Sequence, residues 1–127
     1  MTIEKIYEKA LYLGEKTNDS TGYIDDEYEK QHKMKAIEII KQCIAKLALI
    51  ENIEIIHPER LEYESEVRLP DYITNVVIPT YTAAILCHQD GEENKYNILI
   101  YEYQQAVENI KHDEEKPDYS HYLEGLV

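Results

Sequence analysis

The chain has 127 residues and a formal net charge of −13, from 26 acidic and 13 basic side chains. This length suits one domain, and 43% hydrophobic residues are too many for a disordered acidic tail. No window approaches the roughly 18 uninterrupted apolar residues of a membrane span, and the first residues lack the basic-then-apolar pattern of a secretory signal. The charge argues against general binding of nucleic-acid phosphates, because that binding needs a clustered Lys/Arg surface.

The acidic charge is concentrated in the second part of the chain. Residues 1–51 hold 10 acidic and 8 basic side chains, a net charge of −2, whereas residues 52–127 hold 16 acidic and 5 basic ones, a net charge of −11. Such an asymmetry indicates either a surface with a specific role or a solvated tail. The two cysteines, Cys43 and Cys87, both fall in apolar patterns of helical period, so we expect buried thiols in a reducing cytoplasm and no disulfide.

The first predicted helix runs from about Ile3 to Leu13. Thr2 is a suitable cap for its start, and Gly14 suits its end. A polar loop over residues 15–23 follows. The face expected to be buried consists of Ile3, Ile6, Tyr7, Ala10 and Leu11, which recur at helical spacing.

The second predicted helix is longer, from about Asp25 to Leu49 or Ile50. Acidic residues occupy its first two turns, where the helix dipole favours them. Its expected apolar stripe consists of Met34, Ile37, Ile40, Ile44 and Leu47, widened by Ala36, Cys43 and Ala48.

Residues 60–69 alternate strictly between two kinds of side chain. Leu61, Tyr63, Ser65, Val67 and Leu69 form one set, and Arg60, Glu62, Glu64, Glu66 and Arg68 form the other. A period of two is typical of a half-buried strand. Residues 53–56 supply a short candidate partner strand, with residues 57–59 as the turn. A two-stranded arm is marginal alone in water, so we expect this arm, about residues 52–69, to pack on something else.

A third helix is expected after Leu69, with Pro70 at its first position and a kink or break at Pro79, which removes a hydrogen bond. The stretch 89–91 turns the chain, and a fourth helix runs over about residues 92–111. Its stripe consists of Tyr96, Leu99, Tyr103, Ala106 and Ile110. The predicted organisation is therefore a mainly α domain over residues 1–112, a bundle of about four helices with the strand-like arm between the second and third, followed by an acidic tail over residues 113–127.

Two Glu-x-x-His pairs raise the question of a metal site: Glu29 with His32, and Glu54 with His57. Helical di-metal proteins use two such pairs with further carboxylates. Here the pairs flank opposite ends of the second helix, roughly 37 Å apart at 1.5 Å per residue. With 26 acidic residues in the chain, chance pairs are expected, so we predict solvated surface residues and no metal.

Other chemistry has little support in the sequence. The four glycines are scattered singly, so there is no phosphate-binding loop. Cys87 and His88 are adjacent on a helix and therefore point apart. We predict no catalytic residues, no cofactor and no enzyme activity. Tyr7, Tyr81, Tyr96 and Tyr103 are expected in the core with the hydroxyl at the rim, whereas Tyr63, Tyr119 and Tyr122 lie outside the helices, where tyrosine favours either an interface or simple exposure.

Residues 68–86, RLPDYITNVVIPTYTAAIL, carry a resemblance to a known family. Together with the acidic turn and the tyrosine-bearing last helix, this stretch resembles the small head–tail connector proteins of tailed bacteriophages and prophages, also called adaptor or head-completion proteins. The resembling features are Leu69-Pro70-Asp71, Pro79 with Tyr81, and Ala83-Ala84. The order of elements also fits: short helix, long helix, extended segment, kinked helix, last helix, acidic tail.

The resemblance implies a structural virion protein that forms a ring of identical subunits. Such a ring sits in the virion neck between the portal protein and a downstream tail or stopper protein, and DNA passes through it without specific binding. Before assembly the protein would reside in the host cytoplasm, with no membrane partner. Some of the acidic charge would then face the channel, where repulsion keeps DNA from sticking.

We expect the arm and the tail to carry the subunit and portal contacts. An alternating arm leaves strand edges unpaired, and pairing with a neighbouring subunit satisfies them. The predicted interface residues are Leu61, Tyr63, Val67, Arg68 and Leu69 in the arm, and Tyr119, Tyr122, Leu123 and Leu126 in the tail. The alternative is a small acidic helical protein that acts as a regulatory adaptor or as a mimic of DNA.

Overall fold

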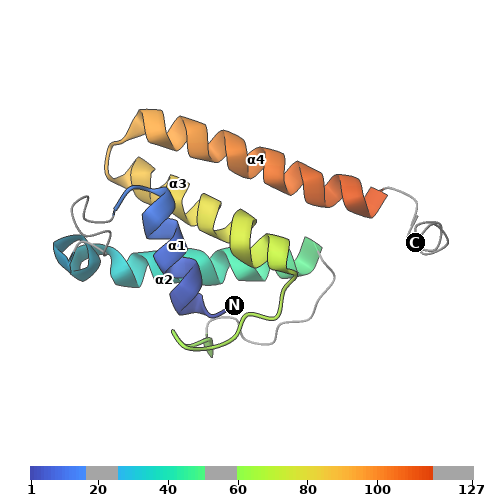
Figure 1. The fold of residues 1–127 in the computed structure, drawn as a ribbon, viewed down its shortest axis with the longest axis horizontal. Helices are drawn as coiled ribbons and strands as arrows, with labels where there is room; N and C mark the ends of the chain where they lie inside the picture. The colour runs from blue at the N-terminus through green and yellow to red at the C-terminus, as the bar shows by residue number, and fades with distance from the viewer. Residues whose placement is uncertain (17–25, 51–59, 116–127) are drawn as a thin grey trace, which may run out of the picture.

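The computed structural model describes residues 1–16, 26–50 and 60–115. Over these residues it is a mainly α bundle of four helices: α1 (Ile3–Leu13), α2 (Asp26–Ile50), α3 (Ile78–Gln89) and α4 (Glu93–Glu115). A π-helical turn, η2 (Ile73–Val77), leads directly into α3. The long helices α2 and α4 lie on opposite sides of α3, and the short α1 crosses α2 and α3 (Figure 1). The predicted fold class is confirmed.

Helix α1 has the predicted bounds and the predicted buried face. The Thr2 hydroxyl accepts a hydrogen bond from the Lys5 amide at 3.2 Å, as expected of a cap. The helix ends at Gly14 as predicted, but Gly14 has an ordinary φ of −82°, and the following residue, Glu15, takes the left-handed φ of 58°. The Lys16 amide then bonds back to the Leu11 carbonyl at 2.7 Å and closes the turn.

Helix α2 begins and ends within one residue of the prediction. Its predicted stripe is buried or half-buried except at Met34, whose side chain is 75% exposed. The prediction that Met34 belongs to the core is therefore wrong. An α-helix advances about 100° per residue, which places Met34 well away from Ile40 and Ile44 around the helix axis.

The alternation over residues 60–69 is confirmed as a pattern of burial, but the prediction of a strand is wrong. Val67 and Leu69 are buried and the charged set points to solvent, yet the described residues contain only one isolated antiparallel bridge here, between Thr2 and Glu66. The Val67 amide donates to the Met1 carbonyl at 2.9 Å. Only two residues precede α1, which begins at Ile3, and two residues are too few to form a β-ladder with the 60–69 segment.

This segment therefore packs against the start of α1 and does not stand free as an arm. The Ile3 and Glu4 amides donate to the carbonyls of Ser65 and Tyr63, at 3.2 and 2.9 Å. The Ser65 hydroxyl accepts from the Glu62 amide at 2.8 Å and stabilises a local turn. Part of the edge that was expected to pair with a neighbouring subunit is thus satisfied within the chain. The candidate partner strand at residues 53–56 and its turn lie outside the described residues.

The break expected at Pro79 takes the form of η2. Proline lacks the amide that would bond to the Asn75 carbonyl, and its ring crowds that carbonyl in a regular α-helix. The chain widens into a π-turn immediately before it, where the Ile78 amide reaches back to the Ile73 carbonyl. Helical bonding starts at the Pro70 carbonyl, which accepts from the Ile73 amide at 2.9 Å, so Pro70 precedes the helix instead of occupying its first position.

A tight turn joins α3 to α4 at Gly91, which has the left-handed φ of 78°. The Glu92 amide bonds to the Cys87 carbonyl at 2.9 Å, the pattern of a helix that ends on a left-handed glycine. Helix α4 continues to Glu115, beyond the predicted end near residue 111. Residues 113–115 thus belong to α4, while residues 116–127 lie outside the described part of the chain.

The core forms where α1, α2 and α3 meet, and α4 covers the outer side of α3 and η2. Cys43 and Cys87 are both buried and free, as predicted. Tyr81, Tyr96 and Tyr103 are half-buried as expected, but Tyr7 is fully buried and its hydroxyl has no hydrogen-bond partner among the described residues. The prediction that its hydroxyl reaches the rim is wrong. No helix in the described segments is long and apolar enough to cross a membrane.

Candidate functional site

The five predicted interface residues of the 60–69 segment fall into three environments. Val67 and Leu69 are buried in the main core and have no surface left for a partner, so their assignment to an interface is corrected. Leu61 and Tyr63 are half-buried against that core, and Arg68 is exposed. The predicted tail residues, Tyr119, Tyr122, Leu123 and Leu126, lie outside the described residues.

The Tyr63 ring is held between two elements of its own chain. Its edge meets the Tyr7 ring at a centroid distance of 6.0 Å, and the Lys33 ammonium lies 4.3 Å from its centroid. Burial, followed by the nearby carboxylates of Glu4 and Glu29, raises the pKa of Tyr63 to about 12. These contacts fix the ring and leave only part of it for any partner.

The first Glu-x-x-His pair is divided between different partners. The Glu29 carboxylate lies 3.4 Å from the Lys33 ammonium, and His32 Nε2 lies 3.9 Å from Asp90 Oδ1. The second pair, Glu54 and His57, is outside the described residues. Within the segments the structure describes, no group of three or more His, Cys, Asp or Glu side chains is placed to hold a metal ion.

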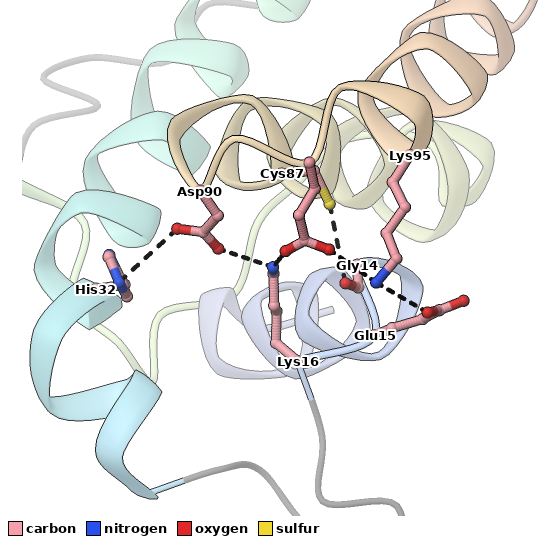
Figure 2. Close-up of polar contacts among 8 residues, drawn as sticks. Gly14, Glu15, Lys16, His32, Cys87, Asp90 and Lys95 are labelled. Atoms are coloured by element: carbon pink, nitrogen blue, oxygen red, sulfur yellow. Dashed lines mark hydrogen bonds and ion pairs between the residues drawn. The ribbon is translucent and has the colours of Figure 1, made fainter.

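The most concentrated polar contacts lie at the end of the bundle where α1 ends and the α3–α4 turn begins. Lys16 points from the end of α1 into the bundle, and its side chain is only 8% exposed. Its ammonium lies 2.7 Å from Asp90 Oδ2 and also pairs with the Glu92 carboxylate. Figure 2 shows the contact between Lys16 and Asp90, with His32 approaching Asp90 from α2. We call Lys16, Asp90 and Glu92 the Lys16 cluster.

Neighbouring side chains extend the Lys16 cluster on both sides. The Lys95 ammonium bridges Glu92 Oε2 at 2.8 Å and Glu15 Oε2 at 2.9 Å. On the other side, the Tyr28 ring lies 5.2 Å from the Lys16 ammonium and stacks on His32 at 4.3 Å. Burial, followed by the nearby Asp90 carboxylate, raises the pKa of Tyr28 above its usual value.

The Lys16 cluster is better placed to hold the ends of helices together than to act on a substrate. The Lys16 ammonium already faces two carboxylates, which balance its charge. The neighbouring thiol of Cys87 lies 3.8 Å from the Gly14 carbonyl, and burial raises its pKa, which disfavours the reactive thiolate. The Lys16 cluster therefore ties the end of α1 to the α3–α4 turn.

No sequence pattern predicted the Lys16 cluster. Lys16 and Glu92 are 76 positions apart, and neither residue belongs to a recognisable motif. The available signal was weak: a lysine directly after the end of a helix, and two acidic residues around Gly91. Only the packing of α1 against α3 brings them together.

A second feature is the large exposed surface of α4. This helix packs only on α3 and η2 among the described elements, apart from minor contacts. Of its residues up to 110, three are buried: Leu99, Ala106 and Ile110. Ile98 and Tyr101 are 61% and 62% exposed. Large apolar side chains of this kind on a helix face are typical of contacts between proteins.

Comparison with family models, with curated proteins and with solved structures finds no match to this chain.

Proposed function

We propose that this chain is a structural head–tail connector subunit of a tailed bacteriophage or prophage. The observation that carries the proposal is the order of its elements. A short helix precedes a long one, an extended segment leads to a helix broken before Pro79, and a last helix packs on its outer side. This is the order in the family that residues 68–86 resemble.

The distribution of side chains supports a role in assembly. The groups of the Lys16 cluster contact one another and hold the fold together, whereas α4 presents exposed apolar side chains outward. A subunit of a ring needs such outward faces for its neighbours. The acidic side chains Glu62, Glu64 and Glu66 are all exposed, and they are candidates to face a channel through which DNA moves.

The part of the predicted interface that remains in the proposal is Arg68, the exposed parts of Leu61 and Tyr63, and the four tail residues. Because α4 continues to Glu115, the tail that would contact the portal protein begins at residue 116. A chain that ends at residue 115 keeps every helix and core residue that the structure describes.

The test is co-sedimentation with the portal protein encoded near this gene. We expect the full-length chain to bind the portal, and the chain lacking residues 116–127 to stay folded by circular dichroism but lose that binding. A control with Tyr12→Ser, altered at an exposed side chain of α1, should bind like the wild type. If the shortened chain binds the portal as well as the full chain, the tail assignment is wrong. If neither chain binds, the alternative of an acidic regulatory protein or DNA mimic is favoured.

A further inference from the structure

We draw no further inference here: the strongest candidate, the outer face of α4 with the exposed side chains of Ile98 and Tyr101, carries nothing beyond the proposed function, because no contact in the described part of the chain shows what covers it.

Discussion

Lys16 is the residue whose environment departs most from its usual one. Lysine side chains are rarely buried unless paired, and this one is almost completely enclosed beside Asp90 and Glu92. Removing one partner of a buried ion pair leaves the other charges desolvated without compensation. Replacing Lys16 is therefore costly mainly because the carboxylates that it leaves behind remain desolvated without their partner.

We expect Lys16→Met to lower the free energy of unfolding by about 2–4 kcal/mol, because the largely enclosed Asp90 carboxylate loses its lysine partner and Glu92 keeps only Lys95. Denaturation by urea, followed by circular dichroism, measures the change. Lys46→Met, which alters an exposed lysine of α2, is the control and should change the stability by less than about 0.5 kcal/mol. Equal effects of the two substitutions would contradict the structural role of the Lys16 cluster.

Several buried groups make the fold sensitive to alkaline pH. Burial raises the pKa of Cys43 to about 12, and burial together with neighbouring groups raises the pKa of Tyr63 and of Tyr103 to about 12. In the unfolded chain these groups lose their protons near pH 9 for the thiol and pH 10 for the phenols. Between those values and pH 12 the folded state holds more protons than the unfolded state, so stability falls as pH rises.

The expected result is a free energy of unfolding that decreases steadily from about pH 9 to pH 12. Tyr103→Phe, which removes one of the phenols, should make that decrease shallower, whereas Tyr12→Phe at an exposed ring should not. Urea denaturation at a series of pH values gives the slopes. If Tyr103→Phe leaves the slope unchanged, the pKa of Tyr103 is not raised in the folded state, and the explanation is contradicted.

At the scale of elements, strongly periodic segments were predictable and context-dependent ones were not. The bounds of α1 and α2 follow from apolar residues that repeat every three or four positions, and they were predicted within one residue. The 60–69 segment has a strand's alternation, but a strand needs a partner of sufficient length, and the two residues before α1 provide only one bridge. The Lys16 cluster depends on tertiary packing, which no local pattern encodes.

The two helix ends with left-handed residues provide a matched pair of substitutions. Gly91 has φ 78°, and no atom lies within 4 Å of the place that a β-carbon would occupy there, so Gly91→Ala adds only backbone strain and should cost about 1 kcal/mol. Glu15 has φ 58°, so Glu15→Gly relieves strain and should stabilise by about 0.5–1 kcal/mol after the loss of its exposed ion pair to Lys95. Thermal denaturation measures both changes. Shifts of the same sign in the two variants would contradict this explanation.

At the scale of the whole molecule, the net charge of −13 is unevenly distributed along the chain. Residues 52–127 carry most of the acid, a net charge of −11, whereas residues 1–51 have a net charge of −2. In the proposed ring, exposed acidic side chains such as Glu62, Glu64 and Glu66 would face the channel and repel DNA.

Electron microscopy of the full-length protein mixed with its portal protein tests the connector proposal most directly. We predict a closed ring of copies of this chain attached to the portal. Portal particles that remain bare at saturating concentrations of the folded protein would contradict the proposal.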